Sequence, residues 1–165
     1  MPLPCLVSSL AEQQRLRAEC ARVGVETFTS ARYQPGLLRH IVLFRYADHV
    51  TPADKERVMH RFLALQDECR RDGEPYLLGI ETGAQASGEG ADHGLEQGFL
   101  VTFASAGDRN HYAGTPVVDD PRYFDPAHAA FKELVGPLLA PSDDPACPCG
   151  VLVFDFRVAH ATFLR

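Results

Sequence analysis

Two segments near opposite ends of the chain are apolar on both of the faces that a β-strand presents. The first segment, 38–46, carries β-branched and aromatic residues at both even- and odd-numbered positions, which point to opposite faces of a strand. The second segment, 150–158, has the same pattern. A sheet with one face in water would instead show a regular alternation of apolar and polar residues. Both segments are therefore predicted to be strands that are covered on both faces, and this limits the folds open to the chain.

The residues between these segments predict two more strands and two helices. Thr51-Pro-Ala-Asp54 supplies the hydroxyl cap, the proline and the acidic residue that begin a helix, and Asp125-Pro126 begins another. The expected elements are, in order, a strand at 38–46, a helix from 51 to about 73, strands at 75–83 and 95–104, a short helical piece near 106–113, a helix from 125 and a strand at 150–158. This order is the split βαβ arrangement of an α+β, ferredoxin-like βαββαβ sandwich.

The two helices of such a sandwich cover only one face of the sheet, so the second apolar face needs a different partner. Leu152, Phe154 and Phe156 would lie together on one face of the last strand. Two copies of the sheet, stacked face to face, would remove these side chains from water. We therefore predict a homodimer in which two sheets form a dimeric α/β barrel.

Residues 1–36 are predicted to be an N-terminal extension that is partly helical. Ser9-Leu-Ala-Glu12 has the spacing of a capping box, so a helix is expected at 10–23. The alternating residues that follow favour a short edge strand or a loop over 25–36. The expected organisation is an extension at 1–36, a main domain at 37–158 and a C-terminal tail at 159–165.

The charge balance argues against two classes of partner. With 22 acidic and 16 basic residues the formal net charge is −6, so the chain lacks the basic field that holds nucleic acid or an anionic membrane surface. No apolar run approaches the roughly 20 residues that cross a bilayer, and the first residues lack the basic lead-in of a signal peptide. We therefore expect a soluble, cytoplasmic protein.

The cysteines and histidines do not have the spacing of a metal site. Five cysteines are an odd number, which argues against a disulfide framework. Cys147 and Cys149 form the one close pair, whereas zinc and redox sites normally use a two-residue spacer or a second pair. No His-x-x-x-His spacing is present either. We therefore expect neither a metal nor a cofactor.

Four phrases, in the order in which they occur, resemble the stress-responsive dimeric α/β-barrel (Dabb) family. Arg39-His-Ile-Val-Leu-Phe-Arg-Tyr46 resembles the first strand of that family, and Gly98-Phe-Leu-Val-Thr-Phe103 is similar to its third strand. Asp125-Pro-Ala-His-Ala-Ala-Phe131 resembles its Pro-x-His-x-x-Phe helix start, and Val153-Phe-Asp-Phe156 resembles its closing strand. The resemblance covers about 38–158.

This resemblance implies a set of site residues. The family includes stress proteins with no established reaction, and polyketide cyclases that close a linear poly-β-keto thioester by an aldol condensation. In those cyclases, a pocket is lined by a strand histidine, a histidine at a helix start and a tyrosine near that helix. The two histidines correspond to His40 and His128, and Tyr112 and Tyr123 are alternatives for the tyrosine. A further family histidine falls on Gln97.

Aldol chemistry needs a base that removes a proton from carbon and donors that stabilise the enolate. His128 would lie in the first turn of a helix, whose positive end favours the neutral imidazole, and it is the candidate base. Asp125, if close, would favour the imidazolium instead and could orient the ring through a hydrogen bond, so the sequence leaves the net shift open. His40 and a tyrosine are the candidate donors. The expected substrate-binding residues are Gln97, Phe44, Phe99 and Phe131. The segment 113–124 is predicted to cover or reshape the entrance to this pocket.

The predicted function is that of a cofactor-independent small-molecule enzyme, a polyketide cyclase-like lyase acting on a carbonyl or polyketide-like substrate with a histidine base. The alternatives are a non-catalytic, stress-responsive or small-ligand-binding homodimer, and a cofactor-free monooxygenase or isomerase. An enzyme should have a pocket of several hundred Å³ at which both histidines and a tyrosine hydroxyl converge. A filled interior would favour the non-catalytic homodimer.

Overall fold

Four antiparallel strands form one sheet in the order β4-β5-β1-β6. The computed structural model describes residues 4–141 and 150–162. The strands of the sheet are β1 (Pro35–Phe44), β4 (Gly79–Ala84), β5 (Gln97–Ser105) and β6 (Val151–Arg157). The first and last strands of the predicted sandwich lie side by side, and their register places His40 opposite Asp155. The predicted ferredoxin-like α+β fold is confirmed.

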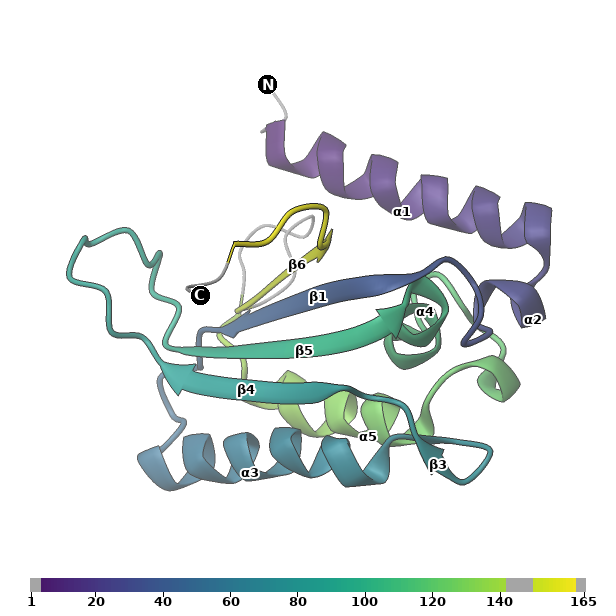
Figure 1. Ribbon diagram of the computed structural model, residues 1–165. Coiled ribbons are helices and arrows are strands. Elements are labelled where there is room, and N and C mark those ends of the chain that lie inside the picture. Colours follow the sequence, from purple (N-terminus) through teal and green to yellow (C-terminus); the bar gives the residue numbers. More distant parts are fainter. Residues whose placement is uncertain (1–3, 142–149, 163–165) are drawn as a thin grey trace.

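The two long helices of the sandwich, α3 and α5, lie together on one face of the sheet (Figure 1). Both begin where the sequence predicts. Thr51 and Asp54 form a capping box at the start of α3, and Asp125 accepts hydrogen bonds from the amides of Ala127 and His128 at the start of α5. The helices are α1 (Pro4–Val23), α2 (Val25–Phe28), α3 (Pro52–Glu68), α4 (Ala106–Ala113) and α5 (Pro126–Val135), with short 3-10 turns η1 (Pro121–Tyr123) and η2 (Gly136–Leu138).

The core lies between these helices and the sheet. Phe62 of α3 stacks on Phe99 of β5, with ring centroids 3.9 Å apart, and Phe131 of α5 meets Phe62 edge to face at 5.1 Å. Phe44 of β1 adds a fourth ring, 5.4 Å from that of Phe99. All these rings are almost fully buried, so each is worth about 1.5–3 kcal/mol in apolar burial. This aromatic cluster joins the sheet to both covering helices.

The opposite side of the sheet, here called the open face, carries large apolar side chains that no helix covers. On β6, Leu152 is 43%, Phe154 57% and Phe156 42% exposed. Ile41 and Leu43 of β1 lie beside them, because Ile41 pairs with Phe154 and Leu43 with Leu152. The predicted distribution of apolar residues over both faces of the sheet is therefore observed.

Two predictions for the N-terminal extension were wrong. The first helix begins at Pro4, so Ser9 lies inside it and does not cap it. The segment 25–28 forms α2, a single helical turn, and neither an edge strand nor a loop. Its last residue, Phe28, is 1% exposed, so burial of one aromatic side chain overrides the β-like alternation of the local sequence.

The region around the second predicted strand also differs from expectation. Helix α3 ends at Glu68 instead of continuing to about residue 73. A short hairpin of β2 (Arg70–Arg71) and β3 (Glu74–Pro75) follows, with Asp72 and Gly73 at positive φ in its turn. Strand β4 starts at Gly79, and residues 76–78, which the apolar pattern assigned to the strand, form an irregular connection between the hairpin and β4.

The extension is held to the domain by a close contact at Gly107, in the first turn of α4. The Gly107 amide donates to the carbonyl oxygen of Tyr33 at 3.1 Å. A Cβ atom at Gly107 would lie 1.7 Å from the carbonyl oxygen of Ser30, a backbone atom that cannot rotate away. Only glycine fits this contact.

We expect Gly107→Ala to lower the free energy of unfolding by about 3 kcal/mol, since the backbone at Ser30 or the start of α4 must move. Urea denaturation followed by circular dichroism measures the change. Gly136→Ala is the matched control, because a Cβ there meets nothing within 4 Å. A similar, small effect of both substitutions would contradict the close contact.

Candidate functional site

The structure brings three of the predicted site residues together between the sheet and the helices. The rings of Tyr112, on α4, and His128, on α5, are stacked with centroids 3.7 Å apart. The His40 ring, on β1, meets the Tyr112 ring edge to face at 5.6 Å. Their exposed fractions are 6% for His40, 1% for Tyr112 and 8% for His128. These three residues are called the His–Tyr–His cluster below.

His128 is held as a neutral imidazole with a defined tautomer. Its Nδ1 lies 2.6 Å from the carbonyl oxygen of Tyr112, and because a carbonyl only accepts, Nδ1 carries the proton and donates. Nε2 then keeps a free electron pair. Burial, followed by the nearby charges of Lys132 and His40, lowers the pKa of His128 to about 3 against the opposing effect of the Tyr112 carbonyl. The ring is therefore uncharged at neutral pH.

His40 is oriented by a carboxylate. Its Nδ1 lies 2.7 Å from Oδ1 of Asp155, the residue opposite it on β6. The other carboxylate oxygen of Asp155 accepts from the Arg109 guanidinium, on α4. Burial raises the pKa of Asp155, but the hydrogen bond from His40 and the charge of Arg109 outweigh it, and the net shift is downward. Asp155 therefore stays ionised, and His40 donates from Nδ1 and leaves Nε2 able to accept a proton.

The Tyr112 hydroxyl is a buried donor without a partner. Among the residues that the structure describes, nothing accepts from or donates to its oxygen. Burial, together with the charges of Cys69 and Asp125, raises the pKa of Tyr112 well above its ordinary value, so the hydroxyl keeps its proton. A buried, unpaired hydroxyl costs about 1–3 kcal/mol, and such a cost is usually found where a ligand or water completes the site.

Asp125 does not orient the His128 ring, although the two residues are close in sequence. One of its carboxylate oxygens caps α5, and the other accepts from the Tyr76 hydroxyl at 2.7 Å. His111 is half-buried, its Nδ1 lies 3.0 Å from the Tyr123 carbonyl, and its ring meets that of Tyr76 at 5.4 Å. Burial lowers the pKa of His111.

The other predicted site residues do not belong to the cluster. Tyr123 lies in η1, with the Arg122 guanidinium 5.5 Å from the centre of its ring. Gln97 lies at the far end of β5, where its side-chain oxygen accepts from the Tyr46 hydroxyl. The three predicted phenylalanines, Phe44, Phe99 and Phe131, form the aromatic core with Phe62.

The segment between α4 and α5 packs beside the cluster. Val118 is 1% exposed, and the Lys132 ammonium donates to the carbonyl oxygens of Ala113 and Thr115 at 2.9 and 3.2 Å. The Arg17 guanidinium, from α1, donates to the Pro116 carbonyl at 2.7 Å. The segment is thus held by contacts from both α1 and α5, next to the residues that flank Tyr112.

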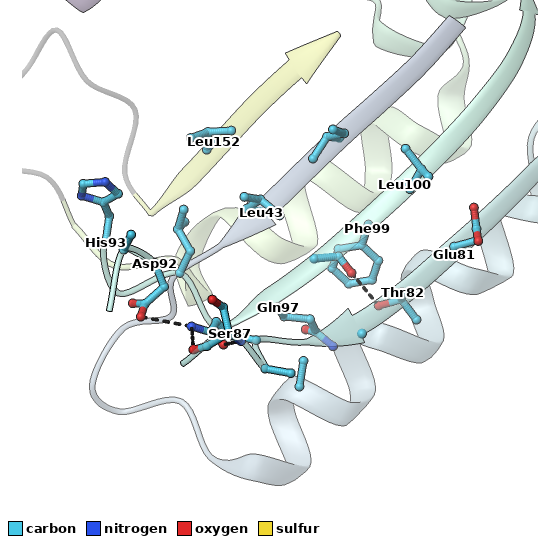
Figure 2. Close-up of a pocket in the computed structure, with 18 of the residues that line it drawn as sticks. Leu43, Glu81, Thr82, Ser87, Asp92, His93, Gln97, Phe99, Leu100 and Leu152 are labelled. Carbon is cyan, nitrogen blue, oxygen red and sulfur yellow. Dashed lines mark hydrogen bonds between the residues drawn. The ribbon is translucent and has the colours of Figure 1, made fainter. Parts of the chain in front are cut away.

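A groove of about 780 Å³ lies on the open face, on the other side of the sheet from the cluster. Figure 2 shows Leu43, Leu100 and Leu152 rising from three neighbouring strands at its floor, with Asp92 and His93 on the loop at one end. This groove is spatially separate from the predicted catalytic residues.

Sequence reasoning missed Asp155 and Arg109 as members of the site. A signal for Asp155 was present. Alternate residues of a strand point to the same face, so Asp155 lies on the face of Val151 and Val153, which is turned toward the helices. A buried acid on such a strand needs a partner. Arg109 gave no comparable signal, since its role depends on how α4 packs against β6.

Two further properties bear on the class of protein. Among the described side chains, no three His, Cys, Asp or Glu residues are grouped as a metal site. Cys147 and Cys149 lie outside the described residues. No helix in the described part of the chain is long and apolar enough to cross a membrane.

The sheet order and the helices on one face define a ferredoxin-like α+β protein with a buried His–Tyr–His cluster. The sequence comparison gives the family: the model of the stress-responsive A/B barrel domain, Dabb, matches residues 38–158. The chain belongs to this family, as the resemblance predicted. The match begins after α1 and α2.

Solved structures with the same fold include proteins from plants and bacteria. A protein from Arabidopsis thaliana is 21% identical, with a TM-score of 0.55 over 76% of this chain and 99% of that one. Hydroxynitrile lyase from Passiflora edulis is 19% identical, with a TM-score of 0.55 over 79% and 99%. A dimeric ferredoxin-like protein of unknown function from Jannaschia sp. CCS1 is 23% identical, with a TM-score of 0.51 over 74% and 100%. A search of curated proteins found no match.

Proposed function

We propose that this protein is a cofactor-independent lyase that makes or breaks a carbon–carbon bond next to a carbonyl group. The observation that carries the proposal is the buried Tyr112 hydroxyl, which has no partner among the described residues and belongs to a ring that contacts the rings of both histidines. One histidine is oriented by a carboxylate and the other is held neutral. Together they supply a base, a donor and an acceptor without a metal or an organic cofactor.

His40 is better suited to act as the base than His128, which was the candidate from sequence. A group whose pKa is about 3 binds a proton too weakly to draw one from carbon at neutral pH. The ionised Asp155 at Nδ1 of His40 stabilises the positive charge that this ring gains when Nε2 takes a proton. His128 would then accept a hydrogen bond from a substrate hydroxyl.

The proposed step follows from these assignments. Nε2 of His40 takes a proton from the carbon beside the carbonyl, and the electrons of that C–H bond form an enolate. The Tyr112 hydroxyl donates a hydrogen bond to the enolate oxygen. The enolate carbon attacks a second carbonyl, whose oxygen receives the proton from His40, and a ring or a longer chain results. Retro-aldol cleavage is the reverse of these steps. With a cyanohydrin, Nε2 of His40 takes the hydroxyl proton, the oxygen forms the carbonyl as the bond to the nitrile carbon breaks, and the cyanide that leaves takes the proton from His40; the Tyr112 hydroxyl donates to the developing alkoxide.

The substrate proposed for this site is a small carbonyl compound, with a polyketide-like chain as the more specific hypothesis. The cluster is 1–8% exposed, so the segment 114–124 must move for a substrate to reach it. The similarity in fold to hydroxynitrile lyase from Passiflora edulis makes a cyanohydrin a second reasonable probe.

Tyr112→Phe tests the proposal. We expect about 10²-fold slower turnover of a poly-β-keto thioester or of mandelonitrile, followed as cyclised product or as benzaldehyde, since only the donor to the developing oxyanion is lost. The fold should gain about 1 kcal/mol, because an unpaired buried hydroxyl is removed.

Tyr123→Phe is the matched control, because it removes the same hydroxyl from the other candidate tyrosine, and it should leave turnover unchanged. Full activity of Tyr112→Phe, or an equal loss in both variants, would refute the assignment of the donor.

Inactivity of the wild-type protein on both probes would favour the alternative, a non-catalytic stress-responsive or small-ligand-binding homodimer. The close packing of the cluster is the observation that favours that alternative.

We also propose that the open face is the contact between two copies of the chain. Leu152, Phe154 and Phe156 expose apolar surface in one continuous area, which is typical of a protein–protein contact. The neighbour from Jannaschia sp. CCS1 is described as dimeric. Stacking two such faces gives the predicted α/β barrel, with one His–Tyr–His cluster in each protomer.

A further inference from the structure

The floor of the groove on the open face contains two glycines that lie opposite one another. Gly83 of β4 pairs with Gly98 of β5, and Gly98 pairs with Leu43 of β1, so all three residues are on the open face. A Cβ atom at Gly83 would meet nothing within 4 Å, whereas one at Gly98 would lie 3.1 Å from Cδ2 of Leu43, so the open space is at Gly83. Glycine inside a strand costs about 0.5–1 kcal/mol relative to alanine, and it often marks a place where a ligand approaches the backbone.

The walls of the groove are apolar on the sheet side and well ordered on the loop side. Leu43, Leu100 and Leu152 line it from the strands (Figure 2), and Ile41 is a further lining residue. The loop that joins β4 to β5 is held by its own hydrogen bonds: the Gln85 side-chain amide donates to Asp92 at 3.1 Å, and the Gly94 backbone amide donates to Asp92 at 2.7 Å. These bonds fix the loop side of the groove.

The charges around the groove select against an anion. Its lining includes the carboxylates of Glu81, Glu89 and Asp92, and no lysine or arginine is among the lining residues in the described part of the chain. The hydrogen bonds to Asp92 lower the pKa of that carboxyl group, first from the Gly94 amide and then from Gln85. The groove therefore presents apolar surface with a negatively charged rim.

We propose that this groove binds a flat, largely apolar small molecule that is neutral or positively charged, and that the molecule lies against Gly83. The volume of about 780 Å³ is within the range of roughly 300–1,000 Å³ that is typical of ligand pockets. The nearby apolar residues and the carboxylate rim match this chemistry.

The proposal requires that a second copy of the chain on the open face leaves this site open, since Ile41, Leu43 and Leu152 belong both to the groove and to that face. Stacked sheets lie about 10 Å apart because side chains from both fill the space between them. At Gly83 the sheet supplies no side chain and a Cβ would meet nothing within 4 Å, so we expect a hollow for the ligand at this position. The proposal is independent of the catalytic one, because the His–Tyr–His cluster lies on the other face of the sheet.

Nile red, a flat neutral dye, is the probe for the test, with the anionic dye anilinonaphthalene sulfonate as its comparison. Titration of the wild-type homodimer, followed by fluorescence, should show tighter binding of Nile red. Gly83→Leu fills the groove and should weaken Nile red binding at least about tenfold. Lyase turnover of this variant should stay at the wild-type level, which separates this proposal from the catalytic one.

Gly79→Leu is the matched control. It is on the same strand and the same face, its Cβ also meets nothing within 4 Å, and it is not among the groove residues. We expect it to change Nile red binding by less than about twofold, with both variants dimeric by sedimentation. Equal loss in both variants, no loss in Gly83→Leu, loss accompanied by dissociation, or tighter binding of the anionic dye would each overturn the proposal.

Discussion

Phe154→Glu is expected to convert the homodimer into monomers. Phe154 is 57% exposed on the open face, in the middle of the edge strand β6, and pairs with Ile41 of the neighbouring strand, so it belongs to the proposed contact. A two-fold contact would bring in the new carboxylate twice, and burial of each carboxylate among apolar side chains costs several kcal/mol. We expect the dissociation constant to rise at least about 10³-fold, measured by sedimentation equilibrium.

Leu134→Glu is the control for this substitution. Leu134 is also an exposed apolar residue, at 39%, but it lies on α5, away from the open face. Its substitution should leave the dimer intact. A wild-type protein that sediments as a monomer, or a Phe154→Glu variant that stays dimeric, would rule out the open face as the contact.

The fold is expected to lose stability as the pH falls from about 6.5 to 4.5, and His128 should cause much of this loss. Burial lowers the pKa of His128 from 6.5 to about 3. Between these values the unfolded chain binds the proton and the folded protein does not, so the free energy of unfolding decreases as the pH falls. Above pH 6.5 His128 is neutral in both the folded and the unfolded chain, so it makes no contribution to the pH dependence. Between pH 6.5 and 4.5 the free energy of unfolding decreases by about 2.5 kcal/mol.

His128→Gln should remove most of this pH dependence while the amide still donates to the Tyr112 carbonyl. Urea denaturation at several pH values measures the slope, which is independent of any constant loss of stability in the variant. His60→Gln, on the exposed face of α3, is the control and should keep the wild-type slope. Equal slopes in wild type and His128→Gln would show that His128 takes up its proton in the folded protein.

Local patterns in the sequence predicted the parts of the fold that depend on neighbouring residues. The helix starts at Thr51 and Asp125 follow from short capping motifs, and the structure has both. The alternation along β1 placed His40 on the same face as Val42 and Phe44, where the helices cover it. The turn at 25–28 and the hairpin after α3 were not predicted, because burial of Phe28 and the turn at Gly73 outweigh the local apolar pattern.

The site was predicted less completely than the fold, since its key contacts join distant segments. Sequence supplied His40, His128 and two candidate tyrosines, but only the packing of α4 against α5 separates Tyr112 from Tyr123. The pairing of His40 with Asp155 depends on the register between the first and last strands. The glycine pair in the groove depends in the same way on the register between β4 and β5.

The proton on His128 is fixed by a main-chain atom, and this has a consequence for how the protein can change. The Tyr112 carbonyl is present whatever side chain occupies position 112, so the free nitrogen of His128 stays the same in every variant of that residue. On the proposed assignment, the acceptor is fixed by the backbone and the donor by the Tyr112 hydroxyl. A substitution at position 112 is therefore expected to change the donor without changing the tautomer of the imidazole.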